Sequence, residues 1–266
     1  MIALALPAQN SGDFTPPGIN EMHLPAILPW GAEYGFSKQM LLVLLSVVII
    51  SAFFMLAARK RQLVPGKLQF AGEAAYGFVR NGIAKDIIGG KDFIKYVPLL
   101  FSLFFFILVN NIYGAIPLFQ LPTFSHVGGA YVLAGIVYFT WIVIGLKKNG
   151  IRYLKLATVP SGVPLYILPI VVPIEIISNF VVRPVTHSLR LFATMLAGHL
   201  IVMIAGYGIE FLISQENIFL QGTSILVLAG AIAMYMLEAL IMVLQAYVFT
   251  LLTAIYIEGA LNADSH

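Results

Sequence analysis

A row of polar side chains runs through an otherwise apolar stretch of the sequence, where chemistry is possible at membrane depth. Its members recur every three or four residues and are Glu175, Asn179, Arg183, His187, Arg190, Thr194 and Gly198. This spacing places them on one face of an α-helix. Arginine keeps its proton in proteins, and an arginine at bilayer depth costs roughly 2.5–3.5 kcal/mol. Arg190, in the run HSLRLFATMLAGHLIV, therefore predicts an ion path or a buried carboxylate partner.

A second polar group lies in the last apolar stretch. Glu238 and Gln245 are seven residues apart, and Glu238 is the only charged residue between positions 217 and 257. If these helices form an antiparallel hairpin with Arg190 and Gln245 at one level, Glu238 lies about 10 Å outward. His199, about 13 Å outward along its own helix, is then near the same depth. A histidine and a glutamate at one depth can relay protons, although nine residues turn His199 away from Arg190 and the pair would need an offset hairpin.

The order of these groups along the helix predicts two separate paths. Glu175 precedes Arg190 by fifteen residues, about 22 Å on the opposite side from His199. The fixed charge of Arg190 would repel a proton moving straight through. A moving carrier must therefore join the two half-paths. A carboxylate on a neighbouring subunit fits, being neutral when it faces lipid and ionised when it faces Arg190.

Composition indicates an all-α integral membrane protein. Of the 266 residues, 60% are hydrophobic and only 10% are charged, against about 25% charged in soluble domains. We expect a Pro/Gly-rich leader outside the membrane, residues 1–35, and a single membrane domain, residues 36–266. The chain has no cysteine, which excludes disulfides and thiolate metal sites, and no cofactor is expected.

Five apolar stretches are long enough to cross a bilayer: residues 40–58, 96–119, 127–146, 163–209 and 223–257. The mixed segment 67–91 is too polar to span and predicts an interfacial amphipathic helix. Eight of the fifteen Lys and Arg residues fall between Arg59 and Lys95, and four more between Lys147 and Lys155. By the positive-inside rule these two loops face the cytoplasm, with the N-terminus outside and the C-terminus inside.

The last two stretches are too long for upright spans. At 47 and 35 residues they measure about 70 Å and 52 Å as helices, against a bilayer core of about 30 Å. Either the first stretch divides into two spans with a turn at RPVTHSLR, or both helices lie steeply tilted as an antiparallel hairpin. A tilt of roughly 55° exceeds the common range, but it keeps the acidic segment 210–222 outside, as the charge distribution favours.

At these residues the chain resembles subunit a of the bacterial F-type ATP synthases, over about residues 40–260. The runs ISNFVVRPVTHSLRLFATMLAGHLIV, EALIMVLQAYVFTLLTAIYIEGAL and FILVNNIYGAIPLF carry the resemblance. The resemblance implies a stator subunit in the bacterial plasma membrane that is not an enzyme on its own. It also implies, as partners, a ring of c subunits, the b subunits of the peripheral stalk and the lipid bilayer, with no nucleic acid.

The resemblance also assigns roles to individual residues. It makes Arg190 the essential arginine that faces the ring carboxylates and Gln245 its neighbour. His199 and Glu238 match the pair of the outer proton path, and Glu175 matches an acidic residue of the inner path. Protons would enter past Glu238 and His199, neutralise a carboxylate of the rotating ring, and leave near Glu175 after nearly a full rotation.

Other positions have supporting or structural interpretations. Asn110 or Asn111 takes the family's asparagine position in the third membrane helix, and Thr194 replaces the usual asparagine with a shorter hydroxyl. Asn179 belongs to the inner path or simply satisfies its neighbours inside the bundle. Thr194 has a supporting role or likewise satisfies its neighbours. Arg183, beside a possible kink at the following proline, favours a structural or interfacial use.

Two other functions predict features that differ from those of this sequence. A stand-alone secondary transporter with Arg190 binding an anionic substrate predicts an inverted repeat and broken half-helices around a midplane site. No internal repeat is visible, and the polar residues form a stripe. An intramembrane enzyme needs a nucleophile–base pair or a metal set. The sequence has no HExxH or GxSxG motif, and no Asp lies between residues 93 and 263.

Overall fold

The structure is a computed structural model that describes residues 38–59, 64–90, 92–116, 127–153, 158, 166–215 and 217–262. Within these ranges the regular structure is helical and contains no strand. The predicted leader, residues 1–35, lies outside the described residues. The all-α fold expected from composition is confirmed.

Five helical stretches are long and apolar enough to cross a membrane. They are α1 (Lys38–Arg59), α4 (Phe93–Ala115), α5 (Val127–Asn149), the continuous stretch from α7 to α8, and α9 (Ile218–Leu261). Each contains at least 18 residues with high mean hydropathy and few charges. Because lipid offers no hydrogen-bond partners, such a segment crosses a bilayer as an α-helix, which satisfies its own backbone groups. The chain is therefore a multi-pass membrane protein.

A more polar helical segment links α1 to α4. It consists of α2 (Lys67–Val79), the π-helical η2 (Arg80–Lys85) and the short α3 (Asp86–Ile88). It ends where Gly89 and Gly90 adopt φ angles of 62° and 59°, a left-handed conformation that glycine adopts without steric cost. This is the segment predicted to be the interfacial amphipathic helix.

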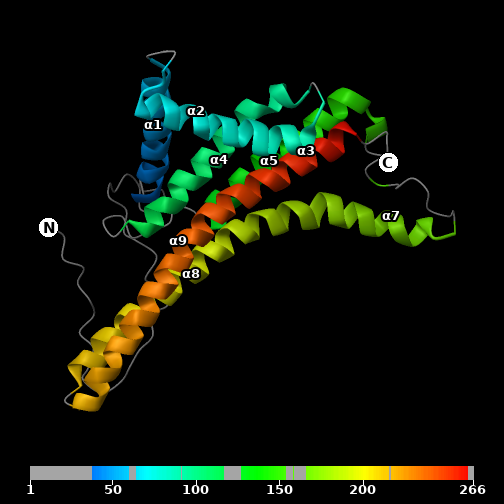
Figure 1. Cartoon of the computed structure of the whole chain (residues 1–266). Helices are drawn as coiled ribbons and strands as arrows, with labels where there is room; N and C mark the ends of the chain where they lie inside the picture. The colour runs from blue at the N-terminus through cyan, green and yellow to red at the C-terminus, as the bar shows by residue number, and fades with distance from the viewer. Residues whose placement is uncertain are drawn as a thin grey trace, which may run out of the picture.

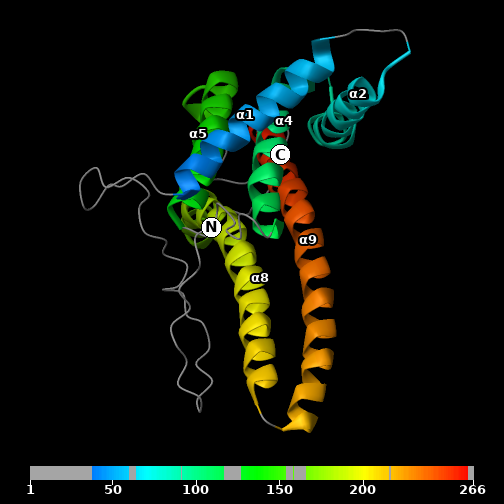
Figure 2. The ribbon, with the colours of Figure 1, turned by 90° about the vertical axis from the view of Figure 1, so that its left-hand side faces the viewer.

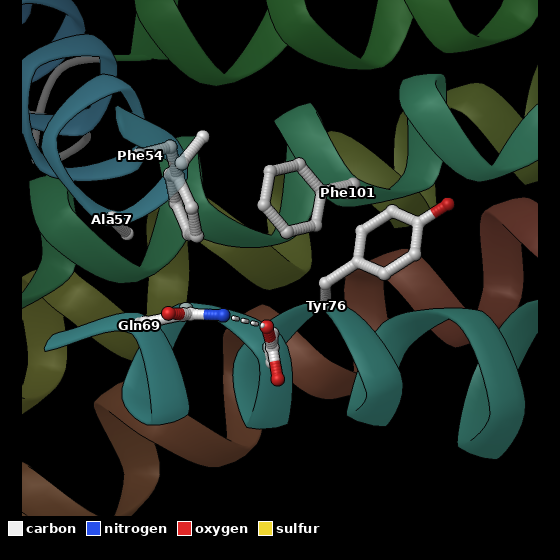
Figure 3. A pocket seen from close by; sticks show the side chains of 8 residues that line it. Phe54, Ala57, Gln69, Tyr76 and Phe101 are labelled. Carbon is white, nitrogen blue, oxygen red and sulfur yellow. Dashed lines mark hydrogen bonds between the residues drawn. The ribbon is translucent and has the colours of Figure 1, made fainter. Parts of the chain in front are cut away.

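Helix α2 packs tightly against the end of α1. A Cβ atom added at Gly72 would lie 2.8 Å from the Cβ of Ala57, so only glycine allows this approach. Beside the contact is a pocket of about 510 Å³ that is lined from α1, α2 and α4 by residues including Phe54, Glu73 and Phe101. Figure 3 shows the rings of Phe54 and Phe101 above the Gln69 amide, which donates a hydrogen bond to Glu73.

The long stretch around Arg190 is helical throughout, so the alternative with a turn at RPVTHSLR is wrong. Helix α7 (Leu168–Ile177) runs through the π-helical turn η4 (Ser178–Val182) into α8 (Arg183–Ser214). Pro184 follows the π turn directly, at the second position of α8, and its missing amide hydrogen leaves the Phe180 carbonyl without its regular α-helical donor. The wider π turn absorbs the proline without breaking the helix, and α8 continues five residues past the predicted end at 209.

Helices α8 and α9 form the predicted antiparallel hairpin (Figure 2). They cross the direction of α1 obliquely, while α7 curves away from α9 (Figure 1). Helix α8 ends at Ser214 and α9 begins at Ile218, where the side chain of Asn217 accepts a hydrogen bond from the amide of Phe219. The 44 residues of α9 measure about 66 Å, so α9 must tilt strongly in a bilayer core of about 30 Å.

The hydrophobic core lies at one end of the hairpin, where η2, α4 and α5 surround the C-terminal part of α9. Its fully buried side chains include Ile83, Leu100, Ile107, Leu191 and Phe249. Toward its tip the hairpin keeps apolar side chains exposed, with Ile225 at 69% and Leu226 at 75%. The hairpin is thus anchored at its base and presents a long apolar surface beyond it.

Candidate functional site

Arg190 is exposed on α8 in the middle of a membrane-spanning helix. Its surroundings on the hairpin are apolar and also exposed, with Leu189 at 42% and, on α9, Val243 at 49% and Leu244 at 51%. Among the residues that the structure describes, the only ion pair joins Lys95 to Asp92. The guanidinium of Arg190 therefore has no carboxylate partner in this part of the chain, and it needs one from outside or from water.

Two contacts fix the register of the hairpin. Glu238 lies against Gly198, where an added Cβ would be 3.0 Å from the carboxyl carbon. The ring of His187 stacks on Phe249 with centroids 3.8 Å apart. Eleven residues separate the two contacts along each helix, so both belong to one antiparallel register. Continued between them, this register places Arg190 level with Ala246, next to Gln245.

The outer residues are grouped around Glu238. The Glu238 side chain is 7% exposed, and its Oε1 has no hydrogen-bond partner among the described residues. Its contact residue Gly198 directly precedes His199, which is half-buried. No hydrogen bond joins Glu238 and His199 in the described chain. The structure therefore brings the two to one level of the hairpin without pairing them directly.

Asn111 connects this group to α4. Its amide nitrogen donates to the carbonyl oxygen of Met242 at 3.2 Å, midway between Glu238 and Gln245 on α9. The neighbouring Asn110 points the other way, toward α1, and donates to the Ser46 hydroxyl at 3.0 Å. Both asparagines are fully buried. Of the two candidates left open by the sequence, Asn111 is the one beside the polar row.

Thr194 does not present its hydroxyl to a neighbour. The hydroxyl donates to the carbonyl oxygen of Arg190 at 2.8 Å, within the same helix. This back-bonding is common for threonine at a helix interior position. An asparagine at this position would extend further from the helix, so Thr194 fills the position without offering an equivalent amide.

The inner residues lie on the stretch that leaves the hairpin. Asn179 is 5% exposed and donates to the Glu175 carboxylate at 3.0 Å. Glu175 is on α7, which curves away from α9 (Figure 1). Arg183, one turn beyond Asn179, holds its guanidinium 5.6 Å from the centre of the Tyr256 ring. The cation–π contact gives Arg183 a structural role in joining α8 to α9.

The polar row also contains His187, for which the sequence pattern predicts no specific role. It is 3% exposed, between Phe249 and Tyr256 of α9. Its place in the row, three residues before Arg190, was visible in the sequence. The burial of His187 could not be predicted from the sequence, because the side of α8 that faces α9 depends on the hairpin register.

Comparison with known proteins identifies the family. The model of the ATP synthase A chain family matches residues 40–258. The chain is 90% identical to ATP synthase subunit a of Pseudarthrobacter chlorophenolicus over the whole of both chains. It is 87% identical to that of Paenarthrobacter aurescens, again over both whole chains, and 46% identical to that of a Nocardioides species over 95% of each. The chain therefore belongs to the ATP synthase A chain family and is a proton-translocating membrane-sector subunit of an F-type ATP synthase.

Proposed function

We propose that the chain is the stator subunit that offers two proton half-channels to a rotating ring of c subunits, with Arg190 as the charge barrier between them. One observation carries the proposal: Arg190 is exposed on an apolar membrane-spanning surface, and its guanidinium has no ion-pair partner among the described residues. A carboxylate on a passing subunit is the natural partner for such a group. The peripheral-stalk b subunits would hold the chain still while the ring turns.

The barrier role follows from the fixed charge of Arg190. At an effective dielectric constant near 20, a guanidinium and a carboxylate 4 Å apart attract by about 4 kcal/mol. A ring carboxylate beside Arg190 is therefore ionised and gives up its proton before it passes. The same positive charge repels a proton that would move directly between the half-channels. Translocation is thus tied to movement of the ring.

The outer half-channel would pass Glu238 and His199 and end near Gln245. Among the described residues, one buried oxygen of Glu238 and the amide nitrogen of Gln245, which is 5% exposed, have no hydrogen-bond partner. Unsatisfied polar atoms at this depth favour bound water, and water between such groups carries protons. The contact of Glu238 with Gly198 keeps this carboxyl group at the level of His199.

The inner half-channel would end at Glu175, with Asn179 behind it. The hydrogen bond between their side chains holds the carboxylate in place. A proton released near Arg190 would travel along α8 and α7 toward Glu175, on the side of Arg190 away from Glu238. Glu175 is the acidic residue of the inner path in this proposal.

The distribution of charge favours one orientation in the bacterial plasma membrane. Lys and Arg are concentrated between Arg59 and Lys95 and between Lys147 and Lys155. These loops would face the cytoplasm, together with the C-terminus. The end of α8 at Ser214, the start of α9 at Ile218 and the leader, residues 1–35, would then face outward.

ATP-driven proton pumping in inverted membrane vesicles tests the proposal. Arg190→Ala should abolish pumping while the complex remains assembled, because the ring carboxylate loses its ionised partner and the half-channels lose their barrier. Arg80→Ala, an arginine exposed on η2 and outside the hairpin, is the matched control and should pump normally. Coupled pumping by an assembled Arg190→Ala complex would contradict the proposal.

A further inference from the structure

His187 is a buried imidazole without a hydrogen-bond partner. Its side chain is 3% exposed, and neither Nδ1 nor Nε2 has a partner among the described residues. Leaving a buried polar group unpaired costs about 1–3 kcal/mol, so each such group in a fold calls for an explanation. Stacking on Phe249 explains the ring's position. It does not explain why the ring should be an imidazole, since a phenyl ring would stack without that cost.

His187 lies in the interval between Arg190 and Asn179, which a proton must cross in the proposed inner path. Arg190 is eleven residues from Asn179, about 16 Å along the helix. His187 divides this interval, about 4.5 Å from the level of Arg190 and 12 Å from that of Asn179. Among the side chains of residues 180–189, it is the only one that takes up and releases protons near neutral pH.

The other polar side chains of this interval form hydrogen bonds or ring contacts of their own. The Thr186 hydroxyl donates to the Val182 carbonyl, and the Ser188 hydroxyl donates to the Val185 carbonyl. The Arg183 guanidinium keeps its proton and lies over the ring of Tyr256. A proton leaving the vicinity of Arg190 thus meets one exchangeable side chain before it reaches Asn179.

The backbone between His187 and Asn179 offers acceptors for water. The amide of Arg183 bonds to the carbonyl of Ser178 in the π-helical turn η4, and Pro184 has no amide hydrogen. The carbonyl of Phe180, four residues before the proline, therefore receives no regular α-helical hydrogen bond. Where the helical hydrogen-bond ladder is interrupted, water or a polar group can take the place of the missing donor, and π turns recur at functional sites.

We propose that His187 is the first proton acceptor of the inner half-channel, an inference that rests on the proposed function. The ring carboxylic acid beside Arg190 transfers its proton through water to one nitrogen of the neutral imidazole. The other nitrogen then releases a proton to water on the side of Asn179 and Glu175, and the imidazole returns to its neutral form. The charged and titratable groups around it include Arg183 and Arg190 on α8 and Tyr256 on α9. The two guanidinium groups disfavour a lasting positive charge, so the proton is passed on.

The first test replaces His187 by Phe in the complete complex. His187→Phe keeps an aromatic ring against Phe249 and removes both nitrogens. Proton pumping and passive proton flow should fall by about 10-fold or more, with normal amounts of assembled complex. Normal proton flow in this variant would overturn the inference.

Chemical rescue separates proton transfer from packing. In His187→Ala, added imidazole should restore proton flow, whereas pyrazole, which has nearly the same shape but is a far weaker base, should not. Equal rescue by both, or by neither, would overturn the inference and assign His187 a packing role. This measurement also decides the question if His187→Phe fails to assemble.

Arg190→Ala measured in parallel keeps the two proposals apart. If Arg190→Ala retains coupled pumping, the stator proposal fails, and the inference for His187 fails with it. If Arg190→Ala abolishes pumping while His187→Phe pumps normally, only the role of His187 is wrong.

Discussion

The carboxyl group of Glu238 lies so close to the backbone of Gly198 that any side chain at position 198 would have to displace it. A Cβ atom at Gly198 would be 3.0 Å from the Cγ, Cδ and Oε1 atoms of Glu238. Because Gly198 is on α8 and Glu238 on α9, the contact sets how closely the two helices approach and how deeply the carboxyl group sits. The residue without a side chain thus positions the only charged residue in the central part of α9.

Gly198→Ala should therefore push Glu238 out of position. Overpacking of this kind costs about 1–3 kcal/mol, so thermal unfolding of the complex should occur at a lower temperature and proton pumping should slow. Gly206→Ala is the matched control, because an added Cβ at Gly206 on the same helix meets nothing within 4 Å. Combining Gly198→Ala with Glu238→Asp, which shortens the acid by one methylene, should recover part of the lost stability. Equal effects of the two single glycine variants would contradict the contact.

The two buried asparagines of α4 should behave differently. Asn111→Ala removes the bond to the Met242 carbonyl between Glu238 and Gln245, so it should slow proton pumping as well as destabilise the complex by about 0.5–1.5 kcal/mol. Asn110→Ala removes the bond to Ser46 on α1. It should lower stability by a similar amount but leave the pumping rate of assembled complex near normal. The reverse pattern in vesicle pumping assays would exchange the two assignments.

The hairpin register predicts a specific disulfide. Because the chain contains no cysteine, introduced pairs report without background. Leu191 and Ala246 are both fully buried in the shared core, and the register places them at nearly the same level. Cysteines at these two positions should crosslink on oxidation, as shown by a gel shift. The pair Leu191 with Thr253, displaced by seven residues or about 10 Å, should not crosslink, since a disulfide requires Cα atoms within about 7 Å. Efficient crosslinking of the displaced pair would disprove the register.

Tyr153, after the end of α5 and outside the spans, gives a pH-dependent prediction. Burial raises the pKa of its phenol to about 12, against the smaller opposing effect of the nearby Arg183 charge. Because the folded pKa lies above the usual value near 10, the protonated phenol's contribution to stability is complete below pH 10. It is lost as the pH rises from 10 through 12. The unfolding temperature of the wild type should thus fall more steeply between pH 10 and pH 12 than that of Tyr153→Phe. Parallel curves of unfolding temperature against pH would refute the assignment.

The fold was largely predictable because hydropathy summed over about twenty residues is a strong signal. The spacing of Arg190, Gln245 and Glu238 also predicted that Glu238 would lie near the depth of His199, and the contact with Gly198 agrees. The sequence left open a turn at RPVTHSLR because a proline, here Pro184, commonly ends a helix. Its place at the start of α8, after a π turn, lets the helix continue.

Other features depend on which neighbour a side chain meets, and sequence spacing does not carry that information. Asn110 and Asn111 are adjacent, so only packing shows that one faces α1 and the other α9. Thr194 satisfies its hydroxyl within its own helix, which its residue type permits but does not require. His187 is buried because the register sets it against Phe249. The roles assigned to the site residues remain predictions.

The unequal embedding of α9 has a mechanical consequence. Its C-terminal part is fixed in the core by buried residues such as Phe249 and Ile257, while near the hairpin tip Ile225 and Leu226 are exposed. A helix of 44 residues clamped at one end behaves as a cantilever, so a sideways load on its tip bends the hairpin about its base. The contact between Gly198 and Glu238 lies beyond the clamped part, toward the tip. The geometry of this contact is therefore sensitive to torque, and a supporting neighbour along the free length would stiffen it.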